Sequence, residues 1–249
     1  MKTLNTYINE WKFNRNTDIK DQYKYFPKNL DQLLDIITKK LKENIEDPFL
    51  NDIDTSQISW MAALFSGYKG NYLSSAGLKP SMIKRLDLRM WDVSNVETME
   101  EMFYECTGLE ELLISTWNTP KLEYVEKMFY HCKNLKKIDF QKFCTSKVRS
   151  TKYMFAQCTN LKQLDLRSFD TSSVNNMCYM FEECPSLEYV NVSSFNTENV
   201  ELMTRIFFNC SKLKSIEGID YWNTDKLYKD QSELQLMFLN CGYRPKWAK

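Results

Sequence analysis

The chain has 249 residues, and its 33 lysine and arginine residues balance its 33 aspartate and glutamate residues, so the formal net charge is zero. This balance argues against non-specific nucleic-acid binding, which calls for an excess of basic side chains to neutralise phosphates. Hydrophobic residues make up 43% and charged residues 27%, as in soluble globular proteins, and the six glycines and six prolines are too few for long flexible linkers.

The start of the chain shows no export signal or membrane anchor. No apolar run of secretory length follows Met1, and no stretch is long and apolar enough to span a bilayer. We therefore expect a cytoplasmic protein that does not contact the membrane, and we expect its eight cysteines to be free thiols.

Residues 1–47 do not repeat, and we expect them to form an N-terminal cap of helices and a short strand over the first coil. The segment 29–45 places its apolar side chains on one helical face, and Asn29 with Gln32 makes a capping box at its start. The other elements expected in the cap are a strand at 23–26 and a first helix carrying Leu4, Ile8 and Trp11.

Residues 48–82 are predicted to be a degenerate first repeat with an insertion. The stretch 52–65 aligns with the start of the next unit, but Tyr68 stands where later units have cysteine. The segment 66–82 then adds about a dozen residues before the first regular strand, an irregularity expected of the terminal units of repeat proteins.

Residues 83–249 are predicted to hold regular repeats and a C-terminal cap, because a 26-residue unit recurs through them. The sequences MFYEC, MFYHC, MFAQC, MFEEC and IFFNC begin at residues 102, 128, 154, 180 and 206. The apolar positions before and after these motifs recur with the same 26-residue spacing. So many aligned columns identify an internal repeat.

Each unit contains two hydrophobic periods. "LDLRSF" at 164–169 alternates apolar and polar residues, which predicts a strand. "VNNMCYMFEEC" at 174–184 has apolar residues at offsets 0, 3, 6, 7 and 10, which predicts a short helix, and "DTSS" before it supplies helix-capping residues. Such a unit cannot bury its own apolar face, so we expect an α/β solenoid with one strand and one short helix in each 26-residue coil.

The stretch "LDLRSFDTSSVNNMCYMFEEC" resembles the consensus of the BspA-like leucine-rich-repeat proteins, a bacterial surface-protein family. The opening "YKYFPKNLDQL" is similar to the head of the non-secreted members, which bacteria and their phages carry. The resemblance implies a right-handed leucine-rich-repeat-like solenoid that contacts other proteins. Many members are exported and mediate adhesion.

The regularly spaced cysteines are predicted to pack in the core, since each lies on the apolar side of its predicted helix. Disulfides between neighbouring coils are the alternative. A metal site would need ligands that converge, and the single His131 stands where other coils have solvent-type residues, so we expect no metal or cofactor. Cys178 is predicted to be exposed. The ladder is made of Cys106, Cys132, Cys158, Cys184, Cys210 and Cys241.

Acidic and amide side chains recur at one position of the predicted strands. A stack of carboxylates could bind calcium, but no glycine-rich calcium loop accompanies them, so a solvated face balanced by nearby arginine and lysine is favoured. No nucleophile elbow, P-loop or zinc-protease motif occurs, so we expect no enzymatic activity. The stripe consists of Asp87, Asp139, Asp165, Asn191 and Glu217.

The outward side of the predicted helices carries more aromatic residues than a solvated face requires. Tyrosine is enriched at binding hot spots, so this side is predicted to bind a partner, with the charged strand face as the competing surface. The predicted contact residues are Tyr104, Tyr130, Tyr153, Tyr179, Phe208, Glu101 and Glu105.

The sequence therefore predicts a non-enzymatic protein-binding solenoid. A sharper hypothesis is an inhibitor of a bacterial defence effector of CRISPR type, an anti-CRISPR protein encoded by a phage or another mobile element. The alternative is a cell-surface adhesin whose export signal is absent here. The inhibitor would use an acidic cluster to imitate phosphates, made of Glu97, Glu100, Glu101, Glu105, Glu110 and Glu111.

Overall fold

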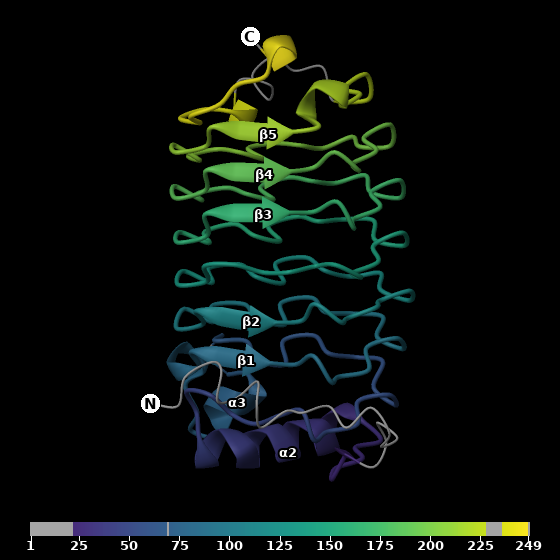
Figure 1. Ribbon diagram of the computed structural model, residues 1–249, viewed down its shortest axis with the longest axis vertical. Helices are drawn as coiled ribbons and strands as arrows, with labels where there is room; N and C mark the ends of the chain where they lie inside the picture. The colour runs from purple at the N-terminus through teal and green to yellow at the C-terminus, as the bar shows by residue number, and fades with distance from the viewer. Residues whose placement is uncertain (1–21, 69, 228–235, 249) are drawn as a thin grey trace.

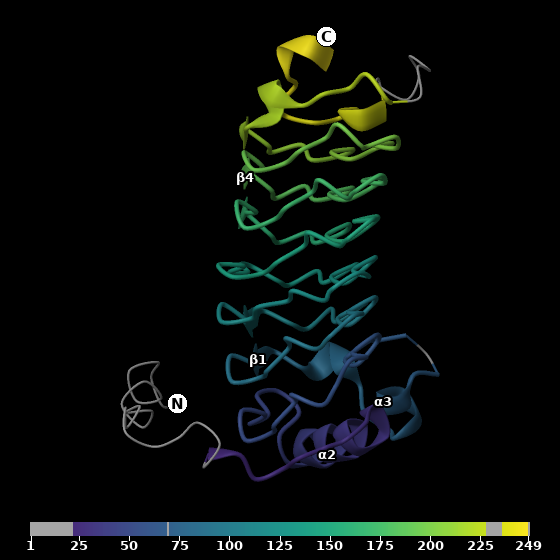
Figure 2. The same cartoon turned by 90° about the vertical axis from the view of Figure 1, so that its right-hand side faces the viewer.

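In a computed structural model of the chain, residues 22–68, 70–227 and 236–248 are described, and coils follow one another along a single long axis (Figure 1). Helices α2 and α3 lie at one end of the stack, and the last strand lies near the other. The strands run along one side, and each coil returns on the opposite side (Figure 2). The helices are α2 (Leu30–Glu43) and α3 (Tyr72–Ser75), with short 3-10 turns at Pro80–Met82, Ile219–Tyr221 and Lys246–Ala248.

The strands are three residues long and pair in parallel with the strand one coil away. Leu164 of one coil lies opposite Val190 of the next, which lies opposite Ile216. The coil at 137–140 joins its neighbours through a single described bridge, Glu111 to Lys137, and this interruption coincides with Phe140, a bulkier residue than its counterparts. The strands are β1 (Arg85–Asp87), β2 (Glu111–Leu113), β3 (Gln163–Asp165), β4 (Tyr189–Asn191) and β5 (Ser215–Glu217).

The short helix predicted in each coil is wrong, because those segments are runs of tight turns. In residues 99–106, Glu101 and Glu105 both have φ of +55°, which is left-handed backbone that no α-helix contains. The N–H of Cys106 closes a turn on the Phe103 carbonyl at 3.1 Å, whereas the N–H of Phe103 donates to Met128 of the next coil at 2.9 Å. Every second amide thus links two coils.

The same two positions are left-handed in each of the five regular coils, although none of the ten residues there is glycine. This conformation costs about 1–2 kcal/mol for most residues, and the bonds between coils offset it. β-branched residues and proline, which tolerate it least, are absent from these positions. The left-handed residues in the repeated coils are Glu101, Glu105, Lys127, His131, Tyr153, Gln157, Tyr179, Glu183, Arg205 and Asn209.

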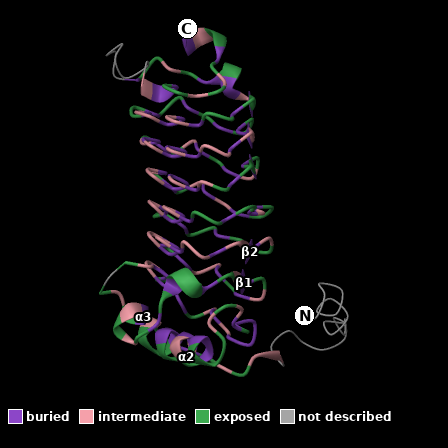
Figure 3. Cartoon of the chain, turned by 90° about the vertical axis from the view of Figure 1, so that its left-hand side faces the viewer, coloured by how far each residue is buried: buried purple, intermediate pink, exposed green. Residues whose placement is uncertain are grey.

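The expected helix caps are also replaced by turns. The carboxylate of Asp170 accepts from the N–H of Ser172 two residues on at 3.0 Å, which is an Asx turn. Thr171 is fully buried, and its hydroxyl donates to the Asn196 carbonyl of the next coil at 2.8 Å. Figure 3 shows buried and exposed residues in alternation along each coil, and Thr171 is one of the buried ones. The same buried bond is made by Thr55, Thr119, Thr145 and Thr197.

Helix α2 covers the first coil and begins with the expected capping pair. The Asn29 side chain accepts from the backbone N–H of Gln32 at 3.0 Å, and the Gln32 side chain accepts from the backbone N–H of Lys28 at 2.8 Å. The predicted strand at 23–26 is a single bridge between Tyr25 and Ile53. The helix predicted around Leu4, Ile8 and Trp11 lies outside the described residues, and the right-handed winding stays a prediction.

Candidate functional site

The cysteine ladder is buried and carries hydrogen bonds that the sequence did not suggest. The Cys132 thiol donates to the Phe103 carbonyl of the preceding coil at 3.0 Å, and Cys158 donates to Phe129 at 3.1 Å. Burial raises the pKa of Cys184 to about 12. A small apolar side chain with a weak donor suits this position. The other members of this ladder are Cys106 and Cys210, which make the same contact, and Cys241, which is only partly buried.

The expectation that Cys178 is exposed is wrong, since only 6% of the residue is accessible. All eight cysteines lie within the described residues, and none of them forms a disulfide. Because the thiolate is the reactive form, we expect iodoacetamide to modify the partly exposed Cys144 and Cys241 in the folded protein and to spare the buried thiols. Mass spectrometry after native labelling measures this, with denatured protein as the control in which all eight react. Labelling of Cys132 as fast as Cys144 would contradict the burial.

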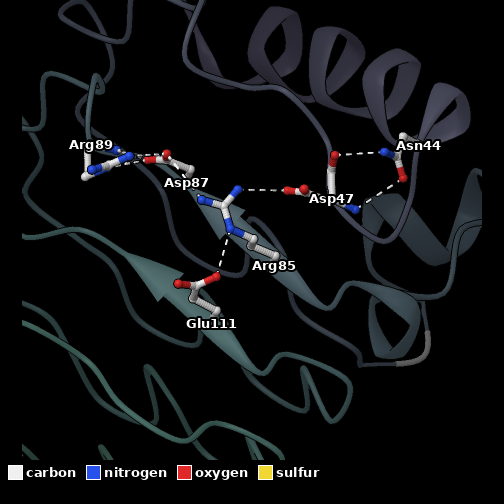
Figure 4. Close-up of polar contacts among 6 residues, drawn as sticks. All are labelled: Asn44, Asp47, Arg85, Asp87, Arg89 and Glu111. Carbon is white, nitrogen blue, oxygen red and sulfur yellow. Dashed lines mark hydrogen bonds and ion pairs between the residues drawn. The ribbon is translucent and has the colours of Figure 1, made fainter. Parts of the chain in front are cut away.

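The strand face is a network of paired charges rather than a row of free carboxylates (Figure 4). Arg85 donates to Glu111 at 2.8 Å and to Asp47 at 3.1 Å. Burial alone would raise the pKa of Asp87, but hydrogen bonds from Arg89, the shortest at 2.6 Å, bring it below its usual value. In the described parts of the chain, no three His, Cys, Asp or Glu side chains are arranged to hold a metal ion.

His131 is partly buried beside the aromatic residues of the returning side. Its Nδ1 lies 3.9 Å from the carboxylate of Glu105. Burial, followed by the positive charge of Lys133, lowers its pKa, so the ring is neutral at pH 7. A neutral imidazole forms no ion pair with the carboxylate of Glu105.

The returning side of the coils forms one continuous surface, which we call the turn wall. It consists of the outward side chains of 96–106, 122–132, 148–158, 174–184 and 200–210. The rings of Tyr104 and Tyr130 stack at 5.1 Å between centroids, and those of Tyr153 and Tyr179 stack at 4.4 Å. Tyr130 and Tyr153 meet edge to face at 5.9 Å, so the four rings form a ladder. Each ring partly covers its neighbour, so they are half-buried rather than exposed.

The structure extends this aromatic surface beyond the predicted residues. Tyr68, which is 62% exposed, meets Tyr104 edge to face at 6.4 Å. Trp60 and Tyr124 are 58% and 56% exposed and lie on either side of the buried Thr98 through backbone bridges. Their alignment at one repeat position was visible in the sequence, but Thr98, Ser150 and Asn176 fill that position in other coils and hid the column.

The predicted acidic cluster is divided by pairing with cations. Glu101 contacts Lys127 at 2.9 Å on the turn wall. Glu110 contacts Lys136 at 2.6 Å, and Glu111 is part of the strand-face network. Half of the six carboxylates are thus already neutralised by a neighbouring coil, which argues against one continuous phosphate mimic.

Of the predicted partner-binding residues, Phe208 lies under Arg205, whose Cζ is 4.7 Å from the ring centroid.

Two tyrosines of the ladder should ionise late. Burial, followed by the charge of Glu105, raises the pKa of Tyr104 to about 12, and burial with Tyr179 does the same for Tyr153. A spectrophotometric titration should show a late phase whose amplitude falls by two tyrosines in the variant Tyr104→Phe with Tyr153→Phe. Since the folded pKa lies above the unfolded value, stability should fall between about pH 10 and pH 12. A single transition near pH 10 for all tyrosines would contradict the burial of the stacked tyrosine rings.

The chain matches the family described as "Mycoplasma protein of unknown function, DUF285" in three overlapping segments, 28–137, 71–188 and 136–242. The chain belongs to this family. DUF285 is a BspA-like repeat family, so the resemblance drawn from the repeated unit is confirmed at that level, whereas the phage or non-secreted type stays a prediction. No curated protein matches the chain significantly. Among the described residues, no helix of this DUF285 member is long and apolar enough to cross a membrane.

Proposed function

We propose that this protein is a non-enzymatic, right-handed solenoid that binds another protein through its turn wall. The observation that carries the proposal is the tyrosine ladder, in which Tyr104, Tyr130, Tyr153 and Tyr179 follow one another across four coils. Tyrosine supplies a large contact area with little loss of side-chain freedom, and it is enriched at binding hot spots.

The turn wall suits a partner better than the strand face does. Charged groups on the strand face already pair within the chain, as Arg167 does with Asp165 at 2.6 Å and Lys214 with Glu188 at 2.6 Å. Exposed pairs of this kind contribute little to affinity. The turn wall instead offers aromatic rings whose burial against a partner would remove apolar surface from water.

The finer proposal is that the partner is a cytoplasmic defence effector of CRISPR type and that the gene comes from a phage or another mobile element. The head "YKYFPKNLDQL", with its likeness to non-secreted BspA-like proteins, supports this version. Blocking an effector by occupying its surface requires a rigid scaffold and no catalytic group. The paired carboxylates favour direct contact with protein over imitation of a nucleic acid.

The test is affinity purification from the native host with three baits, read by mass spectrometry. The unmodified chain should recover one stoichiometric protein. The variant with Tyr130→Ser, Tyr153→Ser and Tyr179→Ser should lose it, and the strand-face control with Arg167→Ala and Lys214→Ala should retain it. Full recovery by the tyrosine variant would refute the turn wall as the binding surface, and recovery of no stoichiometric protein would refute the proposed function.

A further inference from the structure

Charge is unevenly distributed along the turn wall. The segments 96–106 and 122–132 carry six carboxylates and one lysine, whereas 148–158 carries two basic residues and no acid. The later segments, 174–184 and 200–210, contain fewer acids than the first two. The carboxylates concentrated at this end are Glu97, Glu100, Glu101, Glu105, Glu123 and Glu126.

Most of these carboxylates form no close ion pair with a lysine or arginine of the described chain. Lys127 forms an ion pair with Glu101, and His131, which lies near Glu105, is neutral at pH 7. Burial raises the pKa of Glu100, and the nearby charges of Glu126 and Glu101 raise it further. The charge of Lys127 opposes this rise, but two carboxylates remain close to Glu100, so a cation brought by a partner would relieve their repulsion.

Three exposed aromatic residues lie at the same end of the wall. Trp60 and Tyr124 flank Thr98, and Tyr68 stands beside Tyr104 at the first coil. Each of these three exposed side chains is more than half accessible. Acidic groups and open aromatic rings thus occur together on three consecutive coils.

In the later coils, aromatic rings of the turn wall already bind cationic side chains of the same chain. Lys152 Nζ lies 5.6 Å from the ring centroid of Tyr153, and the Arg205 guanidinium covers Phe208. In the described residues no such cation lies over Tyr104 or Tyr130. Tyr104 and Tyr130 cover each other's faces, so the open, electron-rich faces that attract a guanidinium are those of the exposed rings beside them.

We propose that segments 96–106 and 122–132, together with Trp60 and Tyr68, dock an arginine-rich basic segment of the partner protein. Guanidinium groups stack on the exposed rings of Trp60, Tyr68 and Tyr124, and they pair with the carboxylates around Glu100 that form no ion pair. This inference rests on the proposed function and adds the chemistry of the partner and the end of the wall that it contacts.

Isothermal titration of the full chain with a nona-arginine peptide tests the inference. We expect binding that weakens with added salt, and a nona-lysine peptide that binds about threefold more weakly, because the ammonium stacks less well on rings. The pair Glu100→Gln and Glu126→Gln should weaken arginine-peptide binding about tenfold. The matched control with Glu198→Gln and Asp220→Asn, which removes two exposed acids elsewhere, should leave it unchanged.

Equal weakening in both variants, or no binding of the arginine peptide, would overturn the inference. So would a dimer of the free chain that dissociates on Tyr124→Ser, because a second copy would then cover this end of the wall. If the native partner is lost by the tyrosine variant but retained by Glu100→Gln with Glu126→Gln, this inference fails while the proposed function stands.

Discussion

Phe155→Ala is expected to destabilise the protein by about 3–5 kcal/mol. Phe155 is fully buried in a stack of parallel rings, 5.3 Å from Phe129 and 5.7 Å from Phe181 between centroids. Phe140 also packs against its edge at 5.9 Å. Removal of the ring leaves a cavity in the middle of the stack, where neighbouring coils support one another, and urea unfolding monitored by circular dichroism measures the loss.

The matched control is Tyr221→Ala, because Tyr221 is aromatic but 88% exposed. A surface change of this kind should alter the free energy of unfolding by less than about 0.5 kcal/mol. If Phe155→Ala cost no more than the control, the phenylalanine stack would not be a source of stability.

Lys40→Ala is expected to destabilise the N-terminal cap by about 3–5 kcal/mol, because it leaves a buried carboxylate without its partner. Lys40 Nζ lies 2.8 Å from one oxygen of Asp52 and 3.0 Å from the other, with both side chains nearly inaccessible. The ammonium also lies 4.9 Å from the ring centroid of Tyr25. The free energy of unfolding from denaturant titration measures the effect.

The double variant Lys40→Met with Asp52→Leu provides the control, since it removes both charges and keeps apolar volume. Replacement of a whole buried ion pair is often neutral, so the double variant should recover most of the stability. A double variant as unstable as Lys40→Ala would show that the loss comes from packing around residue 40 and not from the unpaired charge.

Burial in each coil could be predicted from the sequence, but the conformation of the returning half could not. Val174, Met177 and Cys184 follow helical spacing and are buried, yet the segment that carries them is a run of turns. Consecutive four-residue turns bring nearly the same positions inward as a helix does. The distinguishing signal was the absence of β-branched residues at the left-handed positions, such as Tyr179 and Glu183.

The turn wall was predictable only in part for a related reason. Tyr153 and Tyr179 are left-handed residues, and the ring of Tyr153 meets that of Tyr130, which shares a different repeat position with Tyr104. Helical geometry predicted that both positions face outward, but not that the rings stack. The hydrogen bonds of the cysteine thiols and the buried threonines depend on contacts between coils, which repeat spacing alone does not specify.

Hydroxyl-radical footprinting of the chain with its recovered partner tests most directly whether the turn wall binds protein. The account predicts that oxidation of Tyr104, Tyr130 and Tyr179 falls in the complex, while that of Tyr189 on the strand face is unchanged. Protection of Tyr189 with unaltered oxidation of the turn-wall tyrosines would contradict it and would assign binding to the strand face.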